Sequence, residues 1–210
     1  MLLDLHIHTT RYSSRCSLLD PRRLAGRLLD LGLDGGAITE HNHLWSRREL
    51  DDLTADPASE KLVLVSGKEV ESEIGHLLIF GAPGTIKPFT PLTEITDFVH
   101  RAGGVVIWAH PLRHGRWDSA PDEEIVRTAR ACDAVEALTP SHSPGENERM
   151  TALAKKHGLA ASGGSDAHAV ESLGRCVTRF HRPIAGLADL LAAIRAGACS
   201  PELGPAGLEY

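Results

Sequence analysis

Histidines and acidic residues stand together at spacings that suit metal binding. The chain of 210 residues contains 12 histidines. His6 and His8 form a His-x-His motif, and because side chains alternate along a strand, both imidazoles leave the same side and can hold one ion together. Imidazoles combined with carboxylates, without a cluster of thiolates, favour zinc, manganese or iron and argue against an iron–sulfur centre.

The same residue types recur where predicted strands end. They end the first, second, third, fifth and seventh strand, while one begins the fourth strand beside Glu69; in chain order they are His6, His8, His41, Glu69, His76, His110, Asp166 and His168. Taken alone, each of these residues is more simply explained as a helix cap, a turn residue or a surface group. The carboxyl ends of barrel strands meet at one mouth, where functional residues gather. Their joint placement therefore predicts one shared metal site.

Short apolar runs alternate with helical patterns. Strands are predicted at residues 2–7, 36–39, 62–69, 77–80, 105–109, 134–138 and 159–162, with a last extended segment at 176–180. Helices are predicted from Asp20-Pro21, at about 45–55, and at 92–102, 121–131, 146–157 and 187–194. This alternation predicts a parallel sheet, with the third and fourth strands as a hairpin. An open nucleotide-binding sheet would carry a glycine-rich loop after the first strand, where this chain has His-Ile-His.

The amino-acid composition and charge disfavour some classes of partner and location. Lys and Arg number 22 and Asp and Glu 28, which gives a net charge of −6. No stretch is strongly basic, so we do not expect extended nucleic acid as the main partner. No apolar run is long enough to span a membrane. The four cysteines show no Cys-x-x-Cys spacing and MLLDLHIH is not a secretory signal, so we expect a cytoplasmic protein.

Six motifs together resemble one family. DLHIHT (4–9), ITEH (38–41), GKEVES (67–72), GHLLIFG (75–81), WAHP (108–111) and GGSDAH (163–168) are similar to motifs of the PHP family, the polymerase and histidinol phosphatase superfamily. The resemblance implies an α/β fold, a distorted (β/α)7 TIM-like barrel formed by residues 1–210 as a single domain. It also implies two or three divalent metal ions (Zn, Mn or Fe) at the carboxyl-terminal mouth.

The family pattern assigns ligands to each ion. The first ion would take His6, His8, Glu69 and Asp166; Glu69 would bridge to a second ion completed by His76 and His110. His41 and His168 match ligands of the third. Many members supply that ion with another His or Asp shortly after the first motif, where this chain has Ser13, Ser14 and Cys16. The sequence therefore leaves alternatives for the third site. It is weak or empty, or it is completed by water or by Cys16. Glu40 stands where Asp is usual.

The implied activity is metal-dependent hydrolysis of a phosphate ester, on a small phosphorylated metabolite or nucleotide. Water activated between two ions would attack phosphorus, with Glu69, His41 and His168 as the catalytic residues. Without a third ion, a protonated His43 or His114 would assist the leaving group. Arg113, Arg116 and Arg15 are the candidate cations for the phosphate, or else solvated loop residues. The alternatives are a histidinol-phosphate phosphatase, a nuclease acting on short ends, and a non-catalytic PHP module.

Overall fold

One sheet carries the strands of the molecule. The computed structural model describes residues 1–113, 115 and 117–207. Within these residues the strands are β1 (Leu2–Ile7), β2 (Gly35–His41), β3 (Val63–Ser72), β4 (Gly75–Phe80), β5 (Val105–Trp108), β6 (Ala134–Leu138), β7 (Ala161–Gly163), β8 (Cys176–Phe180) and β9 (Cys199–Leu203). The helices are α1 (Leu24–Asp30), α2 (Arg47–Leu53), α3 (Leu92–Arg101), α4 (Asp122–Ala129), α5 (Pro144–His157) and α6 (Leu187–Arg195), with 3-10 turns at Pro21–Arg23 and Pro57–Ser59.

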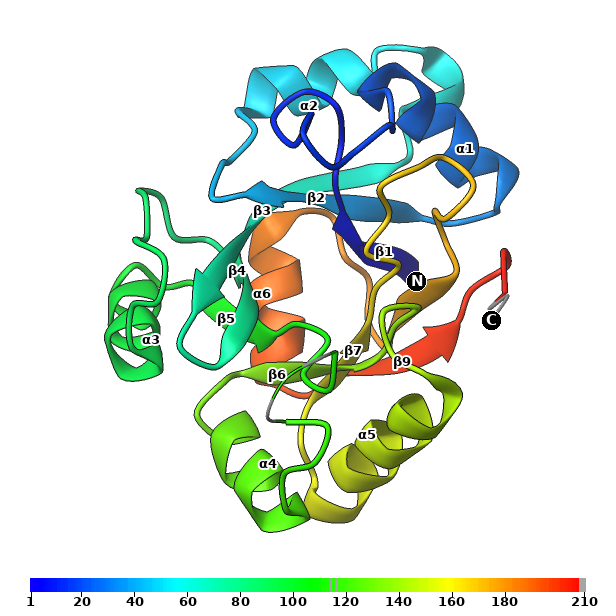
Figure 1. Ribbon diagram of the computed structural model, residues 1–210. Coiled ribbons are helices and arrows are strands. Elements are labelled where there is room, and N and C mark those ends of the chain that lie inside the picture. Colours follow the sequence, from blue (N-terminus) through cyan, green and yellow to red (C-terminus); the bar gives the residue numbers. More distant parts are fainter. Residues whose placement is uncertain (114, 116, 208–210) are drawn as a thin grey trace.

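The sheet curls until its two ends approach. Its order is β7-β6-β5-β4-β3-β2-β1-β8-β9, with β4 antiparallel to both neighbours and β8 antiparallel to β1 and β9. Just beyond β7, Ala167 pairs with Ile7 of β1, and the hydroxyl of Thr178 on β8 bonds to both backbone groups of Gly163. The result is a nearly closed barrel (Figure 1). The predicted α/β barrel is therefore confirmed over the open sheet, as is the β3–β4 hairpin.

Helix α6 lies inside the ring of strands (Figure 1). Its Leu190, Ala193 and Ile194 pack with Leu3, Val105 and other residues near the amino ends of the parallel strands. The other helices cover the outer face, α1 and α2 over one cluster and α3, α4 and α5 over another. Since α6 fills the amino end of the interior, the carboxyl end is left for polar side chains.

The first strand departs from the simple alternation of its sequence. Leu3, Leu5 and Ile7 share one face in the sequence pattern, yet Leu3 and Leu5 pack inside the barrel and Ile7 packs with the outer helices. The register against β2 shifts by one residue between Asp4 and Ile7. A bulge of this kind re-aims the side chains beyond it. Leu5 therefore lies inside the barrel together with the two histidines of the His-x-His motif.

Element boundaries differ from the predictions in a few places. The helix predicted at about 45–55 is only Arg47–Leu53, started by a capping box between Ser46 and Glu49. The seventh strand is Ala161–Gly163 rather than 159–162. Strand β9 was not predicted, because it contains Pro201 and is mostly half-exposed. Proline is tolerated there because β9 lies at the sheet's edge.

Candidate metal centre

Glu69 lies at the middle of the predicted site, with its two carboxylate oxygens facing different histidines. Oε1 is 2.8 Å from His76 Nδ1 and 3.2 Å from His110 Nε2. Oε2 is 3.4 Å from His8 Nε2 and 3.1 Å from His41 Nδ1. Strand β3 presents Glu69 on the same face as the interior residue Val65, four positions earlier. One buried carboxylate is thus shared between two groups of imidazoles.

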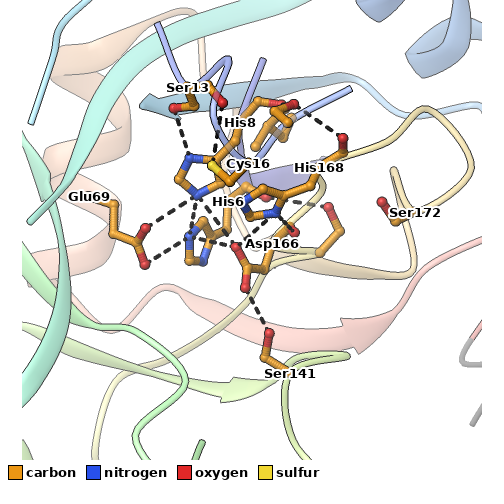
Figure 2. A network of polar contacts seen from close by, with 12 residues as sticks. His6, His8, Ser13, Cys16, Glu69, Ser141, Asp166, His168 and Ser172 are labelled. Carbon is orange, nitrogen blue, oxygen red and sulfur yellow. Dashed lines mark hydrogen bonds and ion pairs between the residues drawn. The ribbon is translucent and has the colours of Figure 1, made fainter. Parts of the chain in front are cut away.

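Asp166 closes the opposite side of the same group (Figure 2). Its Oδ1 is 3.3 Å from His6 Nε2 and 3.4 Å from His8 Nε2. Its Oδ2 accepts hydrogen bonds from Ser141 Oγ at 2.7 Å and from Arg113 Nη1 at 3.0 Å. The two outer donors fix the carboxylate so that its other oxygen faces the histidines.

Glu136, on β6, holds two of the predicted ligands. Its carboxylate lies 3.1 Å from His6 Nδ1, and it accepts a hydrogen bond from the backbone N–H of His110 at 2.9 Å. This contact turns His6 Nε2 toward Glu69 and Asp166, as outer carboxylates do for metal-binding histidines. A Cβ on Gly164 would lie 2.4 Å from Glu136 Oε1, so only glycine fits beside this pair. The sequence analysis missed Glu136, whose only signal was an acidic residue inside a buried strand.

The donor set fits divalent cations. Four overlapping groups each bring three ligand atoms within 4.8 Å of one another, and together they contain all eight predicted ligands: His6–His8–Glu69, Glu69–His76–His110, His6–His110–Asp166 and His8–His41–His168. His6 Nε2 and His8 Nε2 are only 3.1 Å apart. Two imidazole nitrogens and two carboxylates converge there, and a cation relieves the repulsion between their lone pairs. Nitrogen and oxygen donors of this kind suit zinc, manganese or iron.

The charges of the buried groups depend on one another. Burial alone would raise the pKa of Glu69 and of Asp166, but the charge of His6 and hydrogen bonds from neighbouring histidines outweigh it and lower both pKa values. Burial would lower the pKa of His6, yet Asp166, Glu136 and Glu69 raise it well above its usual value. Without a metal ion, a proton on His6 therefore balances the carboxylates.

This balance predicts a pH-dependent metal affinity. A cation at His6 must displace a proton that the raised pKa keeps in place at neutral pH. We expect zinc affinity to rise with pH until the solution pH exceeds that raised pKa, and to fall as the pH drops. Competition with a chromophoric chelator at pH 6, 7 and 8 measures it. An affinity that is the same at all three values would show that His6 is neutral in the metal-free protein.

Backbone conformation at the strand ends also marks the site. Among the described residues, four that are not glycine have positive φ: Asn42, Phe89, His110 at 27° and Asp166 at 49°. Two of the four are predicted metal ligands, and Asn42 follows a third. Such strained conformations persist where the surroundings enforce them, and they gather at functional sites.

The histidines predicted for the third ion lie beside His8. The ring of His8 stacks on His41 and on His168, with centroids 4.6 and 4.5 Å away. Behind them Glu40 is fully buried and accepts hydrogen bonds from Thr9, Ser13 and Trp45. In this structure Glu40 supports the loop after β1 rather than facing the histidines.

Two of the predicted phosphate-binding arginines, Arg113 and Arg15, are among the described residues, and of these two Arg113 contacts the site. Arg113 reaches Asp166 and borders a cavity of about 450 Å³, whose wall also includes His76, His110 and Trp117. Arg15 is exposed in the loop after β1 and makes no ion pair with another described residue. His43 is exposed and stacks on Tyr12 instead of facing the metal ligands. Arg116 and His114 lie outside the described residues.

Comparisons with known proteins give partial matches to this chain. A family model described as PHP-associated matches residues 144–199. The chain is 32% identical over 90 residues, 42% of its length, to the 5′-3′ exoribonuclease Rnm of Escherichia coli (strain K12), and 30% identical over 115 residues, 52% of its length, to the 3′,5′-nucleoside bisphosphate phosphatase of Chromobacterium violaceum. These matches span only 31% and 39% of the two relatives.

A solved structure resembles the whole fold. It is a two-domain protein from Bacteroides vulgatus described as containing a predicted PHP-like metal-dependent phosphoesterase. The TM-score is 0.69 at 17% identity, and the match covers 97% of this chain and 65% of that one. The chain therefore shares its fold with this structure, and its residues 144–199 match the PHP-associated family model. No helix within the described residues is long and apolar enough to cross a membrane.

Proposed function

We propose that the chain is a metal-dependent phosphoesterase that hydrolyses a small phosphorylated metabolite or nucleotide. The observation that carries the proposal is the arrangement of Glu69, whose Oε1 faces His76 and His110 and whose Oε2 faces His8 and His41. A carboxylate shared in this way would bridge two bound ions, and paired ions are the arrangement that two-metal phosphatases use.

The residues would divide the work as follows. His6, His8, Glu69 and Asp166 would hold one divalent ion, and Glu69, His76 and His110 a second. Bound there, divalent ions supply Lewis-acid chemistry: they lower the pKa of water toward neutrality and offset the charge of a phosphate group. Glu136 and Ser141 keep the ligands oriented, and His41 and His168 flank the site where a leaving oxygen would lie.

The surroundings favour a small substrate. The cavity beside His76 and His110 has a volume of about 450 Å³, which suits a metabolite or a nucleotide. Arg113 borders it and is 38% exposed, so its guanidinium can reach a phosphate while it contacts Asp166. The bisphosphate phosphatase among the relatives acts on a substrate of this size.

A nuclease acting on short ends is the second candidate, since another relative is a 5′-3′ exoribonuclease. The net charge of −6 disfavours a long nucleic acid but not a short 5′ end. Histidinol phosphate belongs in the same comparison as a further small monoester.

One assay separates these substrates. Metal-loaded protein is given a nucleoside 3′,5′-bisphosphate, a nucleoside monophosphate, histidinol phosphate or a short 5′-phosphorylated oligoribonucleotide. We expect the highest kcat/KM for a small ester, loss of turnover with a chelator, and recovery on addition of zinc or manganese. Faster shortening of the oligonucleotide would favour the nuclease. No turnover of any of them by protein that retains two ions per chain would contradict the proposal.

Arg113 provides a specific prediction. Arg113→Ala should lower kcat/KM about tenfold. This is the low end of the loss expected when a charged hydrogen bond is removed, because the side chain is partly exposed. Bound metal is measured in parallel, since the substitution also removes a contact to Asp166. Arg182→Ala, at an exposed position in the segment before α6, is the control. Wild-type kinetics in Arg113→Ala would mean that this arginine does not bind substrate.

A further inference from the structure

His142 is a buried histidine to which the proposed mechanism gives no part. It lies in the loop between β6 and α5 and is 2% exposed. Its Nε2 accepts a hydrogen bond from the backbone N–H of Leu112 at 3.0 Å. An imidazole nitrogen that accepts carries no proton, so the ring is neutral and its proton is on Nδ1. Burial lowers the pKa of His142, which agrees with a neutral ring at neutral pH.

The N–H that His142 accepts belongs to the turn that follows β5. The backbone N–H of Arg113 donates to the carbonyl of His110 at 2.9 Å, which closes a turn with Pro111 and Leu112 at its centre. The N–H of Leu112 is not used inside this turn, and Leu112 is fully buried. A buried N–H that loses its acceptor is costly, so the position of this turn depends on His142.

The two ends of this turn carry residues of the candidate site. His110 is a predicted ligand of the second ion, and its φ of 27° is a conformation that the surroundings must enforce. Arg113 borders the cavity that His76 and His110 also line. A displacement of the turn would therefore move a predicted metal ligand and the candidate phosphate-binding arginine together.

The loop that carries His142 is held by α5. Asn147 bonds to both backbone groups of Thr139, at 3.0 and 2.9 Å, and the N–H of His142 donates to the carbonyl of Thr139 at 3.2 Å. A capping box between Ser143 and Glu146 then starts the helix. The acceptor for Leu112 is thus fixed before any ligand binds.

Loop and turn are joined a second time through Asp166. Ser141 Oγ donates to Asp166 Oδ2 at 2.7 Å, and Arg113 Nη1 donates to the same oxygen at 3.0 Å. The contact to Asp166 holds Arg113 at its guanidinium, while the bond from Leu112 to His142 holds the turn at its backbone. Arg113 is therefore fixed at both ends.

We propose that His142 is a positioning residue, whose Nε2 fixes the turn after β5 so that His110 and Arg113 face the same cavity. The proposal rests on the proposed function, because it requires that His110 holds an ion and that Arg113 contacts the phosphate. A neutral imidazole meets the N–H of Leu112 without adding a further negative charge beside the candidate metal centre.

Substitutions of His142 test the acceptor. His142→Phe fills the volume without an acceptor, whereas His142→Gln offers its amide oxygen near the place of Nε2. Kinetics are measured on the best small ester at saturating zinc or manganese, after circular dichroism has shown a folded chain. His142→Phe should lower kcat/KM about 10- to 100-fold, as expected when reacting groups are misplaced, and His142→Gln should keep most of it. His157→Phe, half-buried at the end of α5, is the matched control and should behave as wild type.

A double variant separates positioning from support of the fold. In the Arg113→Ala background, His142→Phe should lower kcat/KM by a smaller factor than in the wild type, because part of its effect acts through Arg113. A role in the fold alone would give the same factor in both backgrounds. If His142→Phe does not fold, His142→Asn replaces it, since this amide is the same as that of Gln but too short to reach Leu112.

Three results would overturn this inference alone. They are wild-type kcat/KM in the folded variant without an acceptor, a His142→Gln as impaired as that variant, and an equal factor in both backgrounds. Wild-type protein that retains two ions and hydrolyses none of the esters would instead overturn the proposed function, and this inference with it.

Discussion

Glu69→Gln should remove at least one metal ion per chain and lower kcat/KM by more than about 100-fold. The amide keeps the size of the side chain but loses the negative charge, and its NH₂ group would face the nitrogens of His76 and His110 or of His8 and His41. Loss of a residue that only orients a ligand typically costs 10- to 100-fold in affinity or activity, so loss of a shared ligand should cost more.

The measurement combines metal analysis with kinetics on the best substrate. Glu123→Gln, an exposed position in the first turn of α4, changes the net charge equally and should behave as wild type. Each single substitution of His41, His76 or His110 should be milder than Glu69→Gln, because each of these histidines is assigned to one ion. Full metal content with normal turnover in Glu69→Gln would rule out a bridging role for this carboxylate.

The sequence predicted much of this arrangement because strand ends determine where side chains converge. Polar residues that follow buried apolar runs mark those ends, and a barrel brings them to one mouth. His76 shows the same logic in an antiparallel pair: it lies opposite Glu71, two residues from Glu69, so it falls on the same face as Glu69. No knowledge of the loops was needed for these positions.

Features that depend on register or on distant packing were beyond the sequence. The bulge in β1 moves Ile7 to the outer face, although simple alternation groups it with Leu3 and Leu5. The placement of α6 inside the barrel follows from the packing of its apolar face on several strands, which periodicity alone does not specify. In the sequence, Arg15 and Arg113 are both arginines in predicted loops. Only the fold shows that Arg113 reaches Asp166.

Glu136 is the clearest case of a residue that only the fold could identify. In the sequence it is a single acidic residue in the segment AVEAL of β6. In the barrel it is fully buried and contacts both His6 Nδ1 and the backbone N–H of His110. A buried carboxylate needs such partners, and these two belong to the elements that carry the predicted ligands. We therefore expect Glu136 to orient His6 and His110, which are predicted to be ligands of different ions.

Glu136→Gln should weaken metal binding by about 10- to 100-fold, because His6 loses the charged acceptor that fixes the direction of its Nε2. Activity should fall at limiting zinc or manganese and return toward the wild-type kcat at saturating metal, since no ligand atom is removed. Gly164→Ala offers the same test without a change of charge: its Cβ would lie 2.4 Å from Glu136 Oε1 and 2.6 Å from His6 Cβ, which displaces the pair. Glu148→Gln, exposed on α5, is the control for charge. If Glu136→Gln bound metal with wild-type affinity while Glu69→Gln did not, the contact between Glu136 and His6 would contribute to the fold alone, and the orientation of His6 would have to come from the bulge in β1.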